Sequence, residues 1–164
     1  MINHPFEPIF LRSSQTLILG SFPSVKSREQ NFYYAHPQNR FWKLIAKICK
    51  ANIPNNIEEK KELILNNKLA IWDVIKSCEI EGSADSSIQN VEVSDINELI
   101  NKTNIAKVVF NGNKSAESYF KYNKKLENIE YVTLPSTSPA NAQYSFERLY
   151  NIWKNEIIIN SKEE

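Results

Sequence analysis

The chain has 164 residues, 41 % hydrophobic and 24 % charged, which is typical of a globular protein and excludes a disordered or fibrous chain. Its 20 basic and 19 acidic residues leave a net charge of +1, so charge alone indicates no class of partner. Two cysteines are too few for a disulfide framework or a four-thiolate metal site. We therefore expect one domain over residues 1–164, without metal or cofactor.

We expect no secretory signal at the start of the sequence. Met1 to Pro8 lack both the basic start and the apolar run of a secretory signal. No apolar stretch approaches the roughly 20 residues that span a bilayer. We therefore expect a cytoplasmic protein that does not enter a membrane. We also expect a monomer.

The first half of the chain alternates apolar runs with helical patterns. Residues 16–20 form a short apolar run that ends at a glycine, which is typical of a buried strand. Apolar residues then recur at helical spacing over 41–48 and 57–64, and a second strand pattern covers 69–75. This order indicates two strands that pair in parallel across helical connections.

The second half repeats the alternation after a polar segment. Residues 78–93 are polar and have no helical period, so we predict a loop there. Helical spacing at 96–100 precedes a third strand at 106–110, and a helix after Lys114 leads to a fourth strand at 129–134.

A last helix is expected over about 143–158, where apolar residues recur on one side. Strands that alternate with helices pair in parallel and are covered on both faces. The sequence therefore predicts an α/β fold, a three-layer α/β/α sandwich around a short, four-stranded, mainly parallel sheet.

Ligands of an open parallel sheet bind beyond the carboxyl ends of its strands, so the segments that follow the strands belong together. Three of them, 20–42, 111–114 and 135–142, are rich in amides, hydroxyls and aromatic rings. They contain no phosphate-binding glycine loop, dinucleotide fingerprint, Ser-His-Asp set or carboxylate pair. Amides and rings suit a flat heterocycle such as uracil or hypoxanthine, and the Ser/Thr-rich third segment suits phosphates.

Four motifs make a specific resemblance. Leu19–Ser24, Tyr34–Trp42, Phe110–Gly112 and Leu134–Pro139 resemble, in this order, motifs of the uracil-DNA glycosylase superfamily, most closely its hypoxanthine (deoxyinosine) branch. The resemblance runs from about residue 16 to residue 153. It implies an α/β/α fold and the hydrolysis of an N-glycosidic bond that removes a deaminated base and leaves an abasic site. It further implies double-stranded DNA as the partner and no cofactor.

The same resemblance assigns the site. Asn39 corresponds to the catalytic asparagine, Tyr34 to an aromatic ring that stacks on the extruded base, and Asn111 to a reader of the base edge. The loop after the first strand lacks the Asp or Asn with which other branches activate water. The residues assigned to the base pocket are Gly20, Ser21, Phe22, Pro23, Tyr34, His36 and Asn111, and those assigned to DNA contact are Ser136, Thr137, Ser138, Pro139 and Ala140.

Each assignment has a plainer structural alternative. Asn39 directly precedes a helical pattern, and by position alone it is a helix N-cap. Asn111 with Gly112 has the composition of an ordinary strand-to-helix turn, and the serine-rich loop also suits the cap of the last helix. A group of basic residues around the proposed pocket is either solvated surface or part of a DNA contact; it comprises Lys26, Arg28, Arg40 and Lys43.

Two other functions stay open at this point. One is a mismatch-specific uracil-DNA glycosylase, which reverses the order of preferred bases. The other is a non-catalytic nucleic-acid-binding module of the same fold, because the first loop lacks the usual water-activating side chain.

Overall fold

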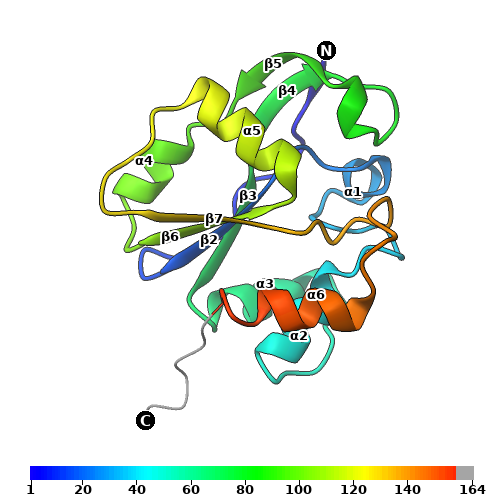
Figure 1. Ribbon diagram of the computed structural model, residues 1–164, viewed down its shortest axis with the longest axis vertical. Coiled ribbons are helices and arrows are strands. Elements are labelled where there is room, and N and C mark those ends of the chain that lie inside the picture. The colour runs from blue at the N-terminus through cyan, green and yellow to red at the C-terminus, as the bar shows by residue number, and fades with distance from the viewer. Residues whose placement is uncertain (158–164) are drawn as a thin grey trace.

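A computed structural model describes residues 1–157 and builds them around a sheet of four parallel strands (Figure 1). The order across the sheet is β3-β2-β6-β7, and the three neighbouring pairs are all parallel. The strands are β2 (Thr16–Gly20), β3 (Leu69–Asp73), β6 (Lys107–Asn111) and β7 (Glu130–Leu134). The predicted four-stranded parallel sheet is confirmed.

Helices cover both faces of this sheet, as the sequence predicts (Figure 1). On one face lie α2 (Phe41–Ile48), α3 (Ile57–Leu65) and α6 (Phe146–Trp153). On the other face lie α4 (Ile96–Asn101) and α5 (Asn113–Tyr122). A short helix, α1 (Val25–Gln30), which the sequence analysis does not predict, follows β2.

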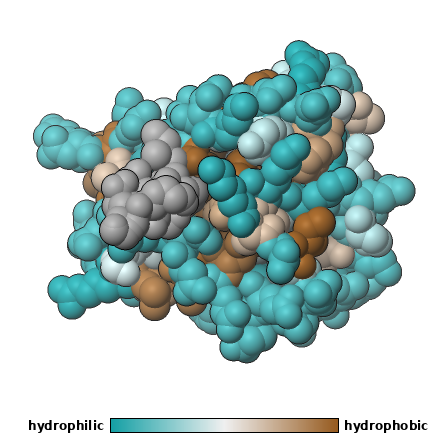
Figure 2. Space-filling model, turned by 90° about the horizontal axis from the view of Figure 1, so that it is seen from below, coloured by the Kyte–Doolittle hydropathy of each residue, from teal (hydrophilic) through white to brown (hydrophobic). Residues whose placement is uncertain are grey.

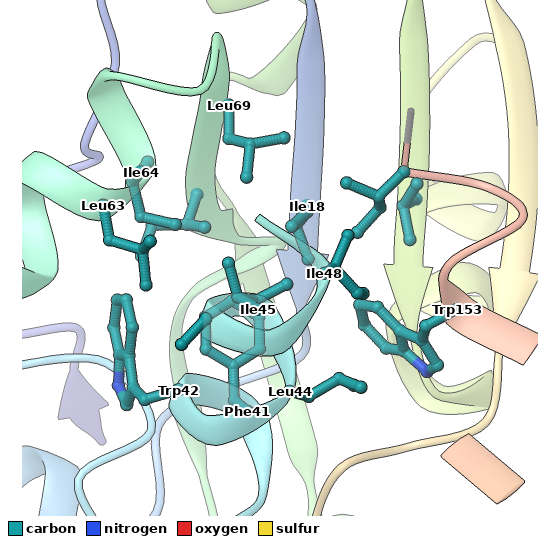
Figure 3. Close-up of a cluster of buried hydrophobic side chains, with 14 of the residues drawn as sticks. Ile18, Phe41, Trp42, Leu44, Ile45, Ile48, Leu63, Ile64, Leu69 and Trp153 are labelled. Carbon is teal, nitrogen blue, oxygen red and sulfur yellow. The ribbon is translucent and has the colours of Figure 1, made fainter. Parts of the chain in front are cut away.

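The larger core lies under α2, α3 and α6, where Phe41, Trp42 and Trp153 pack with aliphatic side chains of the sheet (Figure 3). Both indoles also hold loops that follow strands. Trp42 Nε1 donates to the carbonyl oxygen of Tyr33 at 2.9 Å, and Trp153 Nε1 donates to that of Pro135 at 2.9 Å. The core therefore fixes the backbone beside the predicted site. Outside it, hydrophilic residues cover most of the face seen in Figure 2.

A second, antiparallel sheet corrects the predicted loop at 78–93. It has the order β1-β4-β5 and consists of β1 (Ile2–Asn3), β4 (Ile75–Glu79) and β5 (Gln89–Val93). A 3-10 turn at Asp85–Ser87 lies between β4 and β5. The prediction was wrong because few residues of the segment are apolar: Cys78 and Ile88 are buried against Phe22, and the other positions are largely polar.

The predicted strand at 69–75 is likewise two strands. At Val74 the chain leaves the parallel sheet: its N–H donates to Gly20 O at 2.9 Å, and its carbonyl accepts from Ser94 N at 2.8 Å. The apolar run continues through this change of direction, so the pattern alone could not reveal it.

The last helix is shorter than predicted. It begins at Phe146 rather than at about 143, because the Ser145 hydroxyl caps it by accepting from Arg148 N. Its predicted end, Ile158, lies outside the described residues. Within residues 1–157 no helix is both long enough and apolar enough to cross a bilayer.

The connections of the parallel sheet diverge between β2 and β6. The chain that leaves β2 returns to β3 through α2 and α3 on one face, whereas the chain that leaves β6 returns to β7 through α5 on the other. Such a point opens a crevice beyond the carboxyl ends of the strands, where ligands bind in open α/β sheets.

Candidate active site

A cavity of about 270 Å³ lies at this crevice. Its walls come from the segments that follow β2, β3, β6 and β7. Every residue that the sequence analysis assigned to the site lines it: Gly20, Ser21, Phe22, Pro23, Tyr34, His36, Asn39, Asn111, Ser136, Thr137, Ser138, Pro139 and Ala140. The structure therefore brings four separate segments of the chain together, while the roles of the individual residues remain predictions.

A chain of hydrogen bonds crosses the cavity wall through Thr137. Asn111 Nδ2 donates to Thr137 Oγ1 at 3.1 Å, and the Thr137 hydroxyl donates to Asn39 Oδ1 at 2.8 Å. The backbone N–H of Thr137 donates to Asn111 Oδ1 at 3.0 Å. Asn111 thus binds Thr137 with both ends of its amide, so this contact takes up part of the hydrogen-bonding capacity that the resemblance assigns to the base edge.

Asn39 is held in one orientation. Its Oδ1 accepts from the backbone N–H of Phe41 at 2.9 Å as well as from Thr137, so both carbonyl lone pairs are used. The contact with Phe41 partly fulfils the predicted capping role, although the N-cap position of α2 belongs to Arg40, which makes no side-chain cap. The Nδ2 group has no acceptor within residues 1–157 and is not shut off from solvent. Asn39 therefore presents a free donor at the cavity.

Arg40 ties down the loop that carries Thr137. Its guanidinium donates to the carbonyl oxygens of Ser138 at 2.9 Å and Asn141 at 3.1 Å, and also to that of Tyr144. Its Nε and its backbone N–H both donate to Thr137 O. Among the basic residues around the predicted pocket, Arg40 thus binds backbone carbonyl groups of the protein itself.

Tyr34 has a strained backbone and an unpaired hydroxyl. Its φ of +53° lies in the left-handed region, which residues other than glycine seldom adopt. Residues in such strained conformations cluster at functional sites. Its ring stacks on Phe41 with centroids 4.0 Å apart, so one face of the predicted stacking ring is already covered. The hydroxyl is buried and has no hydrogen-bond partner within residues 1–157.

The hydroxyl of Tyr34 stays protonated at ordinary pH. Burial raises the pKa of Tyr34 far above its usual value, and the negative charge of Asp73 raises it further. The Tyr34 hydroxyl is therefore a hydrogen-bond donor that lacks an acceptor.

Asp73 is a site residue that the sequence analysis missed. It ends β3, lines the cavity, and is only 3 % exposed. His4 Nε2 donates to its Oδ2 at 2.8 Å, and the backbone N–H of Phe6 donates to His4 Nδ1 at 3.4 Å. The signal in the sequence was a single carboxylate in an otherwise apolar run, and placing the strand at 69–75 concealed that Asp73 is its end.

The connection between β4 and β5 of the second sheet also lines the cavity. Ser21 donates to Asp85 Oδ1 at 3.0 Å, and the backbone N–H of Val25 donates to Ser83 Oγ at 2.9 Å. Arg28 donates through its Nε to Pro23 O at 3.2 Å and through Nη2 to Gly82 O at 2.5 Å. Asp85 and Ser83, which line the cavity, were also missed, because they fall in the segment predicted as a loop.

The remaining predicted pocket residues differ in burial. Phe22 is 8 % exposed and packs in the small core under the second sheet as well as lining the cavity. His36 is half-buried at the cavity edge, where its Nδ1 accepts from Gln38 N at 3.0 Å. The structure thus gives His36 the backbone contact of a turn.

The serine-rich loop is exposed in part only. Ser136, Ser138 and Pro139 are half-buried and Ala140 is exposed, whereas the side chain of Thr137 is fully buried. The Thr137 hydroxyl faces Asn39 and Asn111, and the assignment of Thr137 to DNA contact stays a prediction. Gly112 allows the loop to approach β6: its φ is +96°, and a Cβ there would lie 3.1 Å from Ser136 Cβ.

The described part of the chain holds no group of three or more His, Cys, Asp or Glu side chains placed to bind a metal. The cavity offers amides, hydroxyls, aromatic rings and the carboxylates of Asp73 and Asp85.

Comparisons with known proteins show the family of this chain. A sequence model of the uracil DNA glycosylase superfamily matches residues 9–156. A protein of Methanosarcina acetivorans named hypoxanthine DNA glycosylase is 35 % identical over 154 residues, which cover 90 % of this chain and 94 % of that protein. One of the same name from Methanosarcina barkeri is 35 % identical over 140 residues, 83 % and 86 % of the two chains.

The fold has a solved counterpart. A solution NMR structure of a Methanosarcina acetivorans protein, described as a candidate uracil DNA glycosylase, superposes with a TM-score of 0.80 at 33 % identity and covers 94 % of this chain and 96 % of that chain.

Proposed function

Because the chain belongs to the uracil DNA glycosylase superfamily and is a DNA glycosylase for deaminated bases, we propose that it removes hypoxanthine from deoxyinosine in duplex DNA, with Asn39 as its catalytic residue. The observation that carries this proposal is the free Nδ2 donor of Asn39 in a cavity walled by four strand ends. The product is an abasic site.

The reaction breaks the bond between the sugar C1′ and N9 of hypoxanthine. The electron pair of that bond leaves with the base, the sugar gains oxocarbenium character, and water adds to C1′ and gives up a proton to solvent. Negative charge therefore develops on the base. Donors fixed in place before the reaction lower the barrier because they need no reorganisation as the charge appears.

Asn39 has two conceivable roles, to orient the attacking water or to donate a hydrogen bond to the departing base. The orientation of its amide selects between them. An amide whose carbonyl oxygen already accepts two hydrogen bonds has no acceptor to offer a water proton. Its Nδ2–H group, by contrast, is free to donate to the base as charge builds up. We therefore assign Asn39 to stabilisation of the leaving base, and water adds without a strong general base.

Access to the base requires extrusion from the duplex. Flipping costs a few kcal/mol and costs less for a mispaired base, so a deaminated base is favoured before it reaches the cavity. We propose that Ser136, Ser138, Pro139 and Ala140 contact the DNA beside the extruded nucleotide. One chain supplies every wall of the cavity, so we propose a monomer in which residues 1–164 act as one domain, working in the cytoplasm.

The decisive experiment is single-turnover excision from duplexes with one inosine, uracil or xanthine, followed by alkaline cleavage of abasic sites. We expect inosine to be excised fastest, with the Asn39→Ala protein as the control for contaminating glycosylases. Faster excision of uracil would place the protein with uracil-directed enzymes. Duplex binding without cleavage of any of the three would indicate a non-catalytic module and contradict the proposal.

A further inference from the structure

Two polar groups at the base of the cavity have no partner of their own. Asp73 is fixed through Oδ2 by His4, and its Oδ1 accepts no hydrogen bond from residues 1–157. The buried Tyr34 hydroxyl has none either. Asp73 Oδ1 is thus a free hydrogen-bond acceptor, and the Tyr34 hydroxyl is a free donor.

The two groups flank one point. Asp73 Oδ1 and the Tyr34 hydroxyl oxygen both lie less than 3.0 Å from the position that a Cβ would take at Gly20, yet they do not bond to each other. Glycine at this position keeps the space between them open. A buried donor that is left unpaired costs stability, so the persistence of the Tyr34 hydroxyl beside the free Oδ1 of Asp73 indicates a third group that pairs with both.

We propose that Asp73 and Tyr34 together read the Watson–Crick edge of the extruded base: Asp73 Oδ1 accepts from its ring N–H, and the Tyr34 hydroxyl donates to the adjacent carbonyl. Hypoxanthine presents N1–H beside C6=O, and uracil presents N3–H beside C4=O. This inference rests on the proposed function and adds the determinant of its specificity. It assigns the hydroxyl of Tyr34, rather than its ring alone, to recognition.

The pair also explains which bases are refused. Adenine and cytosine carry a ring nitrogen lone pair where the deaminated bases carry N–H, and an amino group where those carry the carbonyl. In a base held in one register by its sugar, the lone pair then faces the carboxylate and the amino group faces the hydroxyl donor. Polar groups left unpaired in a buried site give strong discrimination. Guanine has the same N–H and carbonyl, and its exclusion rests on the cost of extruding it from a stable pair.

Asp73 does not act on the rate in the same way as Asn39. A carboxylate beside the departing base disfavours negative charge there, so its contribution is recognition. His4 is the positioning residue: its Nε2–H occupies Oδ2 and turns Oδ1 to the cavity. Substitution of Asp73 by Asn keeps the oxygen on His4 and turns an NH2 group to the cavity, which replaces the acceptor by a donor.

The test compares deoxyinosine with the unsubstituted purine deoxynucleoside, which has neither the C6 oxygen nor N1–H, in the same duplex. Single-turnover excision is measured for the parent, Tyr34→Phe and Asp73→Asn, with Tyr122→Phe and Asp95→Asn as matched controls. Tyr122 is 43 % exposed at the end of α5, and Asp95 caps α4, where Asn also caps. Thermal unfolding is recorded for every protein.

We expect the parent to prefer deoxyinosine, and each site variant to lower the ratio of the two rates by about 10-fold or more, the scale of one buried hydrogen bond. Tyr34→Phe should keep or raise the unfolding temperature, since it removes an unpaired buried hydroxyl, and a purely structural role would not combine that with altered preference. The controls should keep the parental ratio.

The outcomes separate this inference from the proposed function. A parent that excises no deaminated base refutes the proposed function itself. A parent that excises inosine, with an unchanged ratio in folded Tyr34→Phe, refutes the edge-reading pair and leaves the proposed function standing, whether or not Asp73→Asn folds.

Discussion

The Thr137 hydroxyl donates a 2.8 Å hydrogen bond to Oδ1 of Asn39, a residue 98 positions away in the chain. The same hydroxyl accepts from Asn111, so one buried threonine connects the segments that follow β2, β6 and β7. Because the Phe41 N–H takes the other lone pair of Asn39 Oδ1, the amide can turn only its NH2 group to the cavity. The geometry of the proposed catalytic group is thus set by a residue outside its own loop.

Replacement of Asn39 by Ala tests catalysis against capping. We expect single-turnover excision of inosine to fall by roughly 100-fold or more, the scale of one preorganised polar group, while duplex binding survives. The lost contact with Phe41 should cost about 1 kcal/mol of unfolding free energy. Asn56→Ala, which removes the cap of α3, is the matched control and should keep the parental rate. A stably folded Asn39→Ala protein with the parental rate would make Asn39 a capping residue only.

Thr137 should act through Asn39. Thr137→Val leaves Asn39 Oδ1 and Asn111 Nδ2 each without this partner, so we expect a loss of about 1–3 kcal/mol in unfolding free energy. Excision should fall by about 10-fold or more, because the Asn39 amide is no longer held in one orientation. Thr137→Ser keeps the hydroxyl and should retain most of both properties. Equal losses in Val and Ser would show that the hydroxyl by itself does not hold Asn39, because Ser keeps the hydroxyl.

Arg40 should affect duplex binding without contacting phosphate. Lysine cannot reproduce the several donors that hold the carbonyls of Ser138 and Asn141, so Arg40→Lys should loosen the serine-rich loop and weaken binding to inosine duplexes. In Arg40→Gln, which also removes the charge, the dependence of log Kd on log salt should keep its slope, since no phosphate contact is lost. A slope reduced by about one would instead identify Arg40 as a phosphate ligand.

Stability should decline at alkaline pH. The pKa of Tyr34 is raised by burial, so the unfolded chain releases this proton near pH 10 while the folded chain retains it. The folded state then binds more protons, and the free energy of unfolding falls as pH rises above about 10. Urea unfolding between about pH 9 and 11 should show the decline, and Tyr34→Phe should show a shallower one. The same slope in both proteins would rule out Tyr34 as a contributor.

Activity should survive chelation. Residues 1–157 hold no group of side chains suited to a metal, and the proposed chemistry uses amide and hydroxyl donors. Excision of inosine should therefore proceed at the same rate with and without EDTA. Loss in EDTA that added zinc restores would overturn this expectation.

Much of the fold was predictable because its signals are local. The runs at 16–20 and 106–110 are short, apolar and followed by glycine or asparagine, and parallel strands buried on both faces have this composition. Since the carboxyl ends of parallel strands meet at one edge, the predicted site residues were expected to gather, and the cavity contains all of them. The motif from Tyr34 to Trp42 further indicated the family that the superfamily match bears out.

Other features depend on contacts that no local pattern reveals. The N-terminal strand β1 pairs with β4, and this pairing places His4 against Asp73, 69 residues away. The burial of Thr137 likewise depends on the end of β6, the segment before α2 and the loop after β7 meeting at one point. The sequence by itself determined the parallel sheet and the edge at which the site lies, because periodicity and strand ends are properties of neighbouring residues. Only the tertiary structure decided which polar atoms are paired and which stay free for a base, because pairing depends on distances between segments far apart in the chain.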